Sequence, residues 1–330
     1  MKLKELLTGI SVLECTADPE LEIKEIFYDS RKVTPGSLFV AVSGFAADGN
    51  KFIPMAAEKG AAAVVTAKKP ETDIPYVLVE SDRLALALLG CNFFGRPAEH
   101  MTMIGITGTN GKTSSTLLLK QVLETCLGAK VGLIGTMANM IGQETIPTER
   151  TTPESFELQA LFAKMRDAGC THVVMETSSH ALYLDRVYGV HYDVGVFTNL
   201  SPDHIGPGEH KTFEEYRSWK GQLFKRCTTG VVNIDDENTE ALLEGHTCKL
   251  VTYGCSEKAD YRAGTYQLLR THDFLGVQFH VSGKDDMDVK VNMPGEFSVY
   301  NALAALTVGK VLGLPDEAIH EGLSRCVVKG

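Results

Sequence analysis

The stretch Ile104-Gly-Ile-Thr-Gly-Thr-Asn-Gly-Lys-Thr113 decides how the rest of this chain folds. The apolar run from Met101 to Ile106 leads into it, and residues 114–127 after it carry apolar side chains at helical spacing. The stretch therefore marks a point where a strand turns into a helix. Glycines at such a turn let backbone N–H groups point inward, and the helix N-terminus adds positive potential. The sequence therefore predicts a cradle for phosphate.

The residues expected to bind a nucleotide here are Gly108, Thr109, Asn110, Gly111, Lys112, Thr113 and Ser114. Lys112 would reach the outer phosphates, and the Thr113 hydroxyl would hold Mg²⁺. A strict Walker A loop has glycine five residues before Gly111, where this chain has Ile106. The alternative is a glycine-rich turn without a ligand, but Gly-Lys-Thr between a strand and a helix favours the phosphate site.

The composition narrows the class of protein. A length of 330 residues favours two domains, and 44% hydrophobic residues can fill a core in each. The net charge of −10 and the pI near 5.5 argue against nonspecific binding to nucleic acid. Residues 1–7 contain no secretory hydrophobic segment, and no apolar run approaches about 18 residues. We therefore expect neither a secretory signal nor a membrane span.

The eight cysteines are scattered, and no two form a Cys-x-x-Cys pair, which fits a reducing cytoplasm. His246, Cys248 and Cys255 come near a zinc-like cluster, but their spacing fits no standard zinc site. We interpret them as residues of buried strands.

Residues 1–97 are predicted to form a small α/β domain that ends at Gly95-Arg-Pro97. Its expected strands are 38–42, 63–65 and 76–79, and its expected helices are 53–59 and 83–94. Two polar stretches, residues 28–31 and 44–49, interrupt it. Both can be ordinary loops, but their small polar residues also suit a nucleotide diphosphate or a sugar.

Residues 98–330 alternate strands and helices, which predicts a mainly parallel sheet covered on both faces. Further strands are expected at 130–135, 172–177, 194–198, 230–234 and 249–253, helices at 154–168, 213–226 and 300–312, and a hairpin at 268–281 that turns at His272-Asp273. Thr152 looks like the N-cap of the first of these helices, with Pro153 at its first position. Ligands of such sheets collect at the carboxyl ends of the strands.

Two of the predicted strands deliver polar side chains at their carboxyl ends. Glu176 follows one of them, and His204 follows the other. Both are candidate Mg²⁺ ligands beside the phosphates, although a hard cation takes imidazole less often than carboxylate. The alternatives are a solvated acid for Glu176 and a structural hydrogen-bond partner for His204. Lys220, on the predicted helix 213–226, is by itself best explained as a surface lysine that lies along an apolar face.

Four motifs occur in order: Thr107-Gly-Thr-Asn-Gly-Lys-Thr113, Glu176-Thr-Ser-Ser-His-Ala-Leu182, Phe197-Thr-Asn-Leu-Ser-Pro-Asp-His204 and Pro294-Gly-Glu-Phe-Ser-Val-Tyr-Asn-Ala-Leu-Ala-Ala305. Together they resemble the ATP-dependent Mur ligases of peptidoglycan synthesis. Asp29-Ser-Arg31 and Pro35-Gly-Ser-Leu-Phe-Val-Ala41 look most like the MurE branch, which adds a diamino acid to UDP-N-acetylmuramoyl-L-alanyl-D-glutamate. The resemblance covers almost all of the chain.

The resemblance implies a reaction with two steps. ATP would phosphorylate the free carboxylate of the D-glutamyl unit, and the incoming amine would then displace phosphate from the acyl phosphate to form an amide. The first step brings two anions together. It therefore needs Lys112, Mg²⁺ and backbone amides to offset their repulsion.

The resemblance also implies roles for single residues. Lys220 would be carbamylated by CO₂ and would join Thr113, Glu176 and His204 as a metal ligand. Lys112, Glu176, His204 and Lys220 would form the catalytic set. Asn301 would contact the adenine side of ATP. The UDP-muramoyl peptide would be held by Ser30, Thr151, Thr152, Ser178 and Arg186, the last as a fixed cation for its anionic groups.

The sequence departs from the family at several places. Leu184 stands where the family often has Gln, Phe45-Ala46 replaces a common His-Gln pair, and residues 205–211 differ from the usual Leu-Asp-Tyr-His. These departures concern substrate contacts more than ATP chemistry. Family members continue into a third domain that binds the incoming amino acid, and this chain stops about where that domain should begin. We therefore expect a UDP-substrate-binding domain, 1–97, and an ATP-binding domain, 98–330, without that third domain and with little turnover.

Other interpretations of the motifs stay open. A MurF-type ligase or a folylpolyglutamate synthetase shares the ATPase core, although Asp29-Ser-Arg31 argues against the folate enzyme. A P-loop binding module without ligation is the alternative from a different class, and Glu176, His204 and Lys220 speak against it. The sequence does not say whether L-lysine, meso-diaminopimelate or another amine is added. A monomer is expected.

Overall fold

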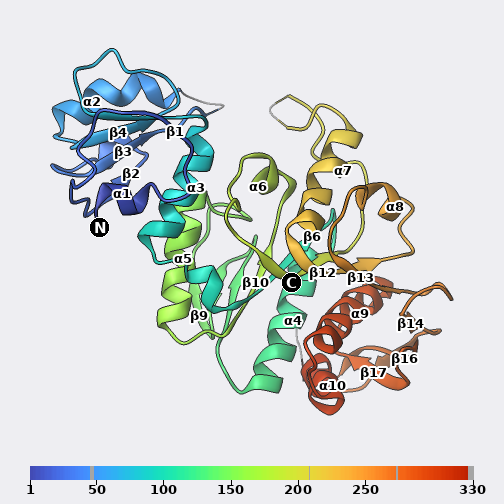
Figure 1. Ribbon diagram of the computed structural model, residues 1–330. Helices are drawn as coiled ribbons and strands as arrows, with labels where there is room; N and C mark the ends of the chain where they lie inside the picture. The colour runs from blue at the N-terminus through green and yellow to red at the C-terminus, as the bar shows by residue number, and fades with distance from the viewer. Residues whose placement is uncertain (45–47, 208, 273, 326–330) are drawn as a thin grey trace. The chain divides into compact units, whose positions relative to one another are not determined.

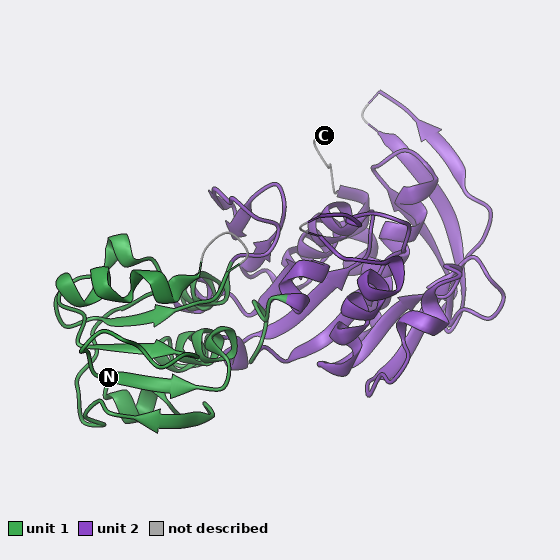
Figure 2. Cartoon of the chain, turned by 90° about the horizontal axis from the view of Figure 1, so that it is seen from above, with its two compact units in different colours: residues 1–97, 154–163, 184–189 green, residues 98–153, 164–183, 190–330 purple. Residues whose placement is uncertain are grey.

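The computed structural model describes residues 1–44, 48–207, 209–272 and 274–325. The chain divides into two compact units (Figure 2). Unit 1 comprises residues 1–97, 154–163 and 184–189, and unit 2 comprises residues 98–153, 164–183 and 190–330. Both units contain a sheet with helices, so the predicted α/β class is confirmed.

The sheet of unit 1 has the strand order β1-β5-β4-β3-β2. Its strands are β1 (Val12–Cys15), β2 (Ile26–Phe27), β3 (Leu38–Ala41), β4 (Ala63–Thr66) and β5 (Tyr76–Val79). β2 to β5 run parallel, and β1 joins the edge antiparallel. The helical segments are α1 (Leu3–Leu6), η1 (Ser30–Lys32), η2 (Gly49–Phe52), α2 (Ile53–Glu58) and α3 (Asp82–Phe93).

β3 shows why unit 1 has a core on each face of its sheet. Its side chains are all buried, which is typical of a parallel strand that is covered on both sides. Leu38 and Val40 belong to the cluster that includes residues of α1 and α3, whereas Phe39 and Ala41 belong to the cluster that includes α2. The alternation follows from the two-residue period of a strand.

The sheet of unit 2 has the order β15-β16-β14-β13-β12-β11-β6-β10-β7-β8-β9, with β17 paired to β16 (Figure 1). The strands are β6 (Thr102–Thr107), β7 (Val131–Ile134), β8 (Asn139–Ile141), β9 (Glu144–Ile146), β10 (His172–Glu176), β11 (Tyr192–Phe197), β12 (Cys227–Asn233), β13 (Lys249–Gly254), β14 (Tyr261–Ala263), β15 (Gln267–Arg270), β16 (Leu275–Gly283) and β17 (Met287–Val291). From β14 through β13, β12, β11, β6 and β10 to β7 the strands are parallel, as predicted. The other pairs are antiparallel, and the predicted hairpin is β15–β16.

The centre of this sheet places the site. β6 is paired with β10 on one side and β11 on the other, although both come later in the chain. In register, Glu176 lies opposite Ile106, and Phe197 lies opposite Thr107. Because the three strands are parallel, the loops that follow them emerge at the same edge, which is where open α/β sheets bind ligands.

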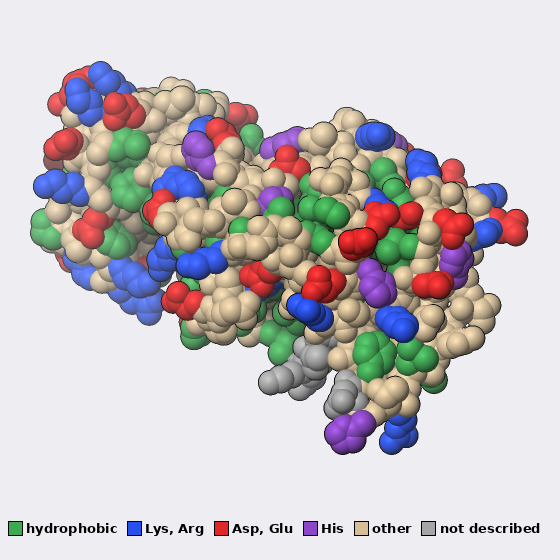
Figure 3. Space-filling model, turned by 90° about the horizontal axis from the view of Figure 1, so that it is seen from below, with side chains coloured by type: hydrophobic (Ala, Val, Ile, Leu, Met, Phe, Trp, Pro, Cys, Tyr) green, Lys and Arg blue, Asp and Glu red, His purple; other side chains and the backbone are tan. Residues whose placement is uncertain are grey.

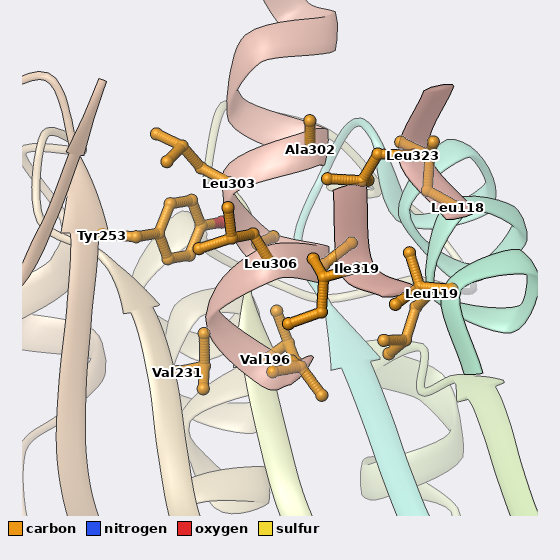
Figure 4. Close-up of a cluster of buried hydrophobic side chains, with 14 of the residues drawn as sticks. Leu118, Leu119, Val196, Val231, Tyr253, Ala302, Leu303, Leu306, Ile319 and Leu323 are labelled. Carbon is orange, nitrogen blue, oxygen red and sulfur yellow. The ribbon is translucent and has the colours of Figure 1, made fainter. Parts of the chain in front are cut away.

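The remaining helical segments are η3 (Pro97–His100), α4 (Lys112–Leu127), α5 (Ser155–Asp167), α6 (Ser179–Tyr183), α7 (Phe213–Gly221), η4 (Gln222–Lys225), α8 (Thr239–Leu242), α9 (Glu296–Val311) and α10 (Asp316–Arg325). In Figure 4, Leu119 of α4, Leu306 of α9 and Ile319 of α10 converge beside Val196 and Val231 of the sheet. All five side chains are buried. This packing fixes the helix that follows the phosphate loop against the strands that precede the other site loops.

Several predicted boundaries were wrong. α4 begins at Lys112 and not at Ser114, and α9 begins at Glu296, directly after Gly295 with φ +95°, and not at Tyr300. The helix expected over 213–226 changes from α to 3₁₀ geometry after Gly221. A side chain at Gly221 would collide with the Leu242 carbonyl oxygen, so tertiary packing decides this position.

The surface carries both signs of charge. Figure 3 shows Asp and Glu side chains interspersed with Lys and Arg on the face in view. Within the described ranges, none of the helices combines the length and the apolar character that crossing a membrane would require.

Candidate active site

The phosphate loop depends on glycine at two positions. Gly111 has φ +82° and stands immediately before α4, and Gly108 has φ +149°. A Cβ at Gly111 would lie 2.6 Å from Asn301 Oδ1, and one at Gly108 would collide with Thr198 Oγ1. Side chains of neighbouring elements therefore lie so close to the backbone at Gly108 and Gly111 that only glycine, which has no Cβ, fits there.

The loop after β11 clamps the phosphate loop. The Asn199 carbonyl oxygen accepts from the Thr109 N–H at 2.8 Å. The Asn199 side chain accepts from the Asn110 N–H at 2.9 Å and donates to the Asn110 carbonyl at 3.0 Å. Thr198 Oγ1 donates to the same carbonyl at 2.8 Å. The backbone at residues 109 and 110 is therefore held by the loop after β11.

Two lysines meet at one carbonyl oxygen. Lys112 Nζ donates to the carbonyl oxygens of Gly108 and Thr109, both at 2.9 Å. Lys220 Nζ donates to the Gly108 oxygen at 2.7 Å and lies 4.5 Å from the centre of the Tyr216 ring. The Lys220 side chain is only 2% exposed. The interpretation of Lys220 as a surface lysine is therefore wrong, because α7 turns it into the core beside the loop.

Burial and like charge act together on Lys220. Burial, and then the nearby Lys112 ammonium, hold the pKa of Lys220 well below its ordinary value, while Asp203 opposes this shift. Burial also lowers the pKa of Lys112, against the influence of Glu176 and Asp203. The surroundings of Lys220 therefore disfavour its charged form.

Glu176 is a buried carboxylate with donors on both oxygens. Its Oε1 accepts from Thr113 Oγ1 at 2.9 Å and from the Thr136 N–H at 3.0 Å, and its Oε2 accepts from Thr136 Oγ1 at 3.0 Å. Its side chain is 1% exposed. Since the Thr113 proton points to the carboxylate, the lone pairs of the Thr113 oxygen remain for a cation. Hydroxyl and carboxylate oxygens are ligands that suit Mg²⁺.

His204 is not assembled with these ligands. Its side chain is 49% exposed, and its Nδ1 lies 3.2 Å from Glu209 Oε1 and its Nε2 3.7 Å from Asp203 Oδ2. Its backbone is left-handed, with φ +51°. In the part of the chain that the structure describes, no three His, Cys, Asp or Glu side chains converge as a metal site requires. Of the expected metal ligands, only Thr113 and Glu176 are in contact.

A histidine cluster lies beside His204. The His180 ring is 4.8 Å from the His210 ring and 5.9 Å from the His204 ring, measured between centroids. His210 is buried and its Nε2 lies 2.9 Å from Ser179 Oγ. Burial, and then His180, lower the pKa of His210. His210 belongs to the stretch 205–211 that departs from the family, and Gly208 of that stretch lies outside the described residues.

Thr152 does not cap the following helix. Its side chain is fully buried, and its Oγ1 donates to the Glu176 carbonyl oxygen at 2.8 Å and accepts from the Ser178 N–H at 3.3 Å. α5 begins at Ser155, and its first turn is closed by the bond from the Leu158 N–H to the Glu154 carbonyl. The predicted N-cap was wrong because the strand end beside Thr152 offers it partners that a local pattern does not show.

The other expected substrate residues of unit 2 adjoin this strand end. Thr151 Oγ1 lies 3.0 Å from Thr136 Oγ1, and Ser178 Oγ accepts from the Ala181 N–H at 3.1 Å. Asn301, expected near adenine, is buried on α9, and its Oδ1 accepts from Ser115 Oγ at 3.2 Å. Ser114 lies in the first turn of α4.

Ser30 and Arg186 belong to unit 1. The Ser30 hydroxyl is 3.4 Å from Met55 Sδ. Arg186 Nη2 forms an ion pair with Glu154 Oε1 at 2.9 Å, and Arg83 Nη1 lies 3.6 Å from the other oxygen of Glu154. These three side chains are 13% to 21% exposed, so one carboxylate serves two largely buried guanidinium groups.

Two of the departures concern unit 1. The Leu184 carbonyl oxygen accepts from Arg83 Nη1 at 3.3 Å, so this position contributes through its backbone. Phe45 and Ala46 lie outside the described residues.

The side chains of Asp29 and Arg31 form an ion pair at 2.8 Å, and the Arg31 guanidinium lowers the pKa of Asp29 to about 2.

Sequence reasoning missed Thr136, Asn199 and Glu154. Asn199 stands within a motif that was quoted for His204, and Glu154 directly follows Thr151-Thr-Pro153, so position offered a signal for both. Thr136 directly follows the predicted strand 130–135, so its position also offered a signal, but its partner Glu176 is 40 residues away and could not be inferred from a local pattern.

The interpretation of His246, Cys248 and Cys255 as residues of buried strands was wrong, because all three lie outside the strands and His246 and Cys255 are exposed. His246 Nδ1 lies 3.2 Å from the Cys248 carbonyl oxygen and 3.9 Å from Cys248 Sγ.

Comparisons with known proteins bear on this arrangement. Residues 106–309 match the family described as Mur ligase middle domain, and residues 22–87 match the Mur ligase family, catalytic domain. A protein of Caldanaerobacter subterraneus named UDP-N-acetylmuramoyl-L-alanyl-D-glutamate–2,6-diaminopimelate ligase is 44% identical over 334 residues, which cover 100% of this chain and 68% of that protein.

Two solved structures share the fold. One, of a UDP-N-acetylmuramoyl-L-alanyl-D-glutamate–2,6-diaminopimelate ligase, superposes with a TM-score of 0.86 at 23% identity and covers 100% of this chain and 67% of that one. The other, MurF from Acinetobacter baumannii, gives 0.69 at 21% identity and covers 99% and 68%. The chain thus spans about two thirds of the length of these relatives.

Proposed function

The chain belongs to the Mur ligase family of ATP-dependent ligases, and from this we propose that it adds 2,6-diaminopimelate to UDP-N-acetylmuramoyl-L-alanyl-D-glutamate. The observation that carries the proposal is the 44% identity, over the whole chain, to a ligase of that name. The paired lysines and the Glu176–Thr113 contact at one sheet edge support the chemistry.

The proposed reaction begins at the phosphate loop. The carboxylate oxygen of the D-glutamyl unit attacks the γ-phosphorus of ATP, an O–P bond forms, and ADP leaves. Lys112 and the first turn of α4 stabilise the charge on the transferring group. A divalent cation held by Thr113 and Glu176 would neutralise phosphate oxygens when bound. The incoming amine then attacks the carbonyl carbon, phosphate leaves, and the amine loses a proton.

Lys220 is proposed to act as a carbamate. Its uncharged amine would attack CO₂, a C–N bond would form, and the nitrogen would lose one proton. The remaining N–H can keep its bond to the Gly108 oxygen. The new anion would turn the repulsion between Lys220 and Lys112 into attraction and would supply oxygen ligands for the cation. His204 would join only after its contact with Glu209 breaks.

Binding tests the proposal without depending on turnover. We would titrate the chain by calorimetry with the UDP-muramoyl dipeptide and with the same molecule carrying the third amino acid. Tighter binding of the dipeptide is expected. Tighter binding of the tripeptide would assign the MurF reaction instead, a candidate kept open by the shared fold. Binding of ATP without either peptide would favour a nucleotide-binding module.

A further inference from the structure

Thr136 lies between the expected metal ligands and the expected substrate residues. It comes after Gly135, just beyond the end of β7, at the same sheet edge as the carboxyl end of β10. Its N–H and its hydroxyl each donate to a different oxygen of Glu176, both at 3.0 Å. Its hydroxyl also lies 3.0 Å from that of Thr151. None of the four quoted motifs contains it.

The approach of Glu176 to this segment needs glycine at the preceding position. A Cβ at Gly135 would lie 2.5 Å from Glu176 Oε1, closer than real contacts allow. The strand end therefore leaves space for the carboxylate and then supplies two donors to it. This arrangement fixes both the position and the rotation of the Glu176 carboxylate.

The hydrogen bonds have a defined direction. The Thr136 hydroxyl has one proton, and an ionised Glu176 can only accept, so that proton lies toward Oε2. The Thr151 hydroxyl must then donate to Thr136. The Thr151 oxygen therefore offers lone pairs to a ligand and acts as an acceptor. A substitution at Thr136 would therefore affect both the Glu176 carboxylate and the hydroxyl of Thr151, an expected substrate residue.

We infer that Thr136 is a positioning residue that orients Glu176 for the divalent cation and sets the polarity of Thr151. The inference rests on the proposed function, because it assigns Glu176 to the cation of that reaction. Partners that orient a metal ligand are worth about 10–100-fold in metal affinity. The backbone N–H of residue 136 is retained in the Val and Ser variants, so we expect the lower end of this range.

The test measures how ADP affinity depends on Mg²⁺. Calorimetric titrations with ADP at a series of MgCl₂ concentrations give the Mg²⁺ concentration for half of the full effect. For Thr136→Val this value should rise about tenfold, while ADP affinity in EDTA should stay unchanged. Thr136→Ser, which keeps the hydroxyl, should behave as the wild type. Residue 136 is exposed, so these variants should fold, and thermal unfolding checks this.

A matched control comes from α9. The Thr307 hydroxyl is buried and donates to the Leu303 carbonyl oxygen of its own helix at 2.7 Å. Thr307→Val should leave the Mg²⁺ dependence unchanged. An unchanged value in Thr136→Val, or an equal rise in Thr136→Ser, would overturn the inference alone. A wild-type chain whose ADP binding ignores Mg²⁺ would overturn the proposed function together with it.

Discussion

Two lysines that share one carbonyl oxygen are the main electrostatic feature of the site. Lys112 and Lys220 both donate to Gly108, and Lys220 is almost fully buried. A buried lysine beside another cation must either lose its proton or stay charged in the core, and both are unfavourable, so this arrangement costs stability. Such costs are typical of functional residues, whose geometry serves the ligand-bound state.

Replacing Lys220 should therefore stabilise the chain. Lys220→Met should raise the free energy of unfolding at pH 7 by about 1 kcal/mol, within the range of stabilising single substitutions. The folded chain holds fewer protons than the unfolded chain between the lowered pKa of Lys220 and its ordinary value. Wild-type stability therefore rises with pH in that window, and the difference should shrink toward pH 10. Urea unfolding at several pH values measures this, and a more stable wild type at pH 7 would contradict it.

Carbamylation of Lys220 predicts a response to dissolved CO₂. Mg²⁺-dependent ADP affinity should be higher in bicarbonate buffer than in CO₂-depleted buffer, because the carbamate adds oxygen ligands for the cation. Lys220→Met should bind ADP equally in the two buffers. Calorimetry in both media decides the matter. A bicarbonate effect that persists in the variant would remove the carbamate from the mechanism.

At the scale of elements, the loops that follow neighbouring strands are joined by hydrogen bonds. The loop after β11 contacts the phosphate loop through Asn199, and the Asp236 carboxylate after β12 accepts from the Leu200 N–H at 2.7 Å. Each strand end therefore supports the next along the sheet. The phosphate loop owes its shape to these contacts as well as to its own glycines.

Asn199→Ala should weaken nucleotide binding. It removes two hydrogen bonds between the Asn199 side chain and Asn110, each worth about 0.5–1.5 kcal/mol. A loop that is less ordered before binding should lose roughly tenfold in ADP affinity, measured by calorimetry. Asn292→Ala is the matched control, because Asn292 also accepts from a backbone N–H, that of Leu275, away from the loop. Equal affinities in the two variants would show that the clamp does not preorganise the site.

In unit 1, Glu154 joins segments that are distant in sequence. Its carboxylate contacts Arg83 of α3 and Arg186 of the segment 184–189. Glu154→Ala should lower the free energy of unfolding by about 2 kcal/mol, below the roughly 3–5 kcal/mol of fully buried pairs, because two guanidinium groups lose their partner. Urea denaturation measures the change. Glu71→Ala, at an exposed position, should have little effect, and a comparable loss there would contradict the argument.

At the scale of the whole molecule, each unit has hydrophobic clusters of its own. In unit 1 two clusters lie on the two faces of its own sheet, and in unit 2 one large cluster joins its sheet to helices α4, α9 and α10. Segments 154–163 and 184–189 belong to unit 1, although residues of unit 2 precede and follow each of them in the sequence. The chain therefore crosses between the units several times.

Hydrogen exchange should show that the two ligands protect different units of the chain. Mg²⁺ with ADP should slow amide exchange in the phosphate loop and α4 and leave β3 and β4 unchanged, because the nucleotide contacts only unit 2 in the proposed function. The UDP-muramoyl dipeptide should slow exchange around Ser30 as well. Exchange followed by mass spectrometry on the same samples tests both statements. Protection of β3 and β4 by ADP alone would contradict them.

The sequence by itself determined the order of elements and the place of the phosphate loop. A mostly apolar strand, a glycine turn and a helical stripe are local patterns, so Met101 to Leu127 could be interpreted without tertiary information. The positions of Glu176 and His204 after strands followed from the same patterns. The predicted helix starts were less accurate. Residues 296–299 belong to α9 in the structure because the packed helix stabilises its first turn, which the local pattern does not show.

Only the tertiary structure decided which polar groups meet. Lys220 is buried because α7 packs beside the phosphate loop, and Thr152 and Thr136 serve the end of β10 because three strands end side by side. The His204 side chain contacts Glu209, whereas we expected it beside Thr113 and Glu176 as a metal ligand. Contacts between residues tens of positions apart depend on strand order and register. A single sequence carries no local signal for either, so folding alone brings these groups together.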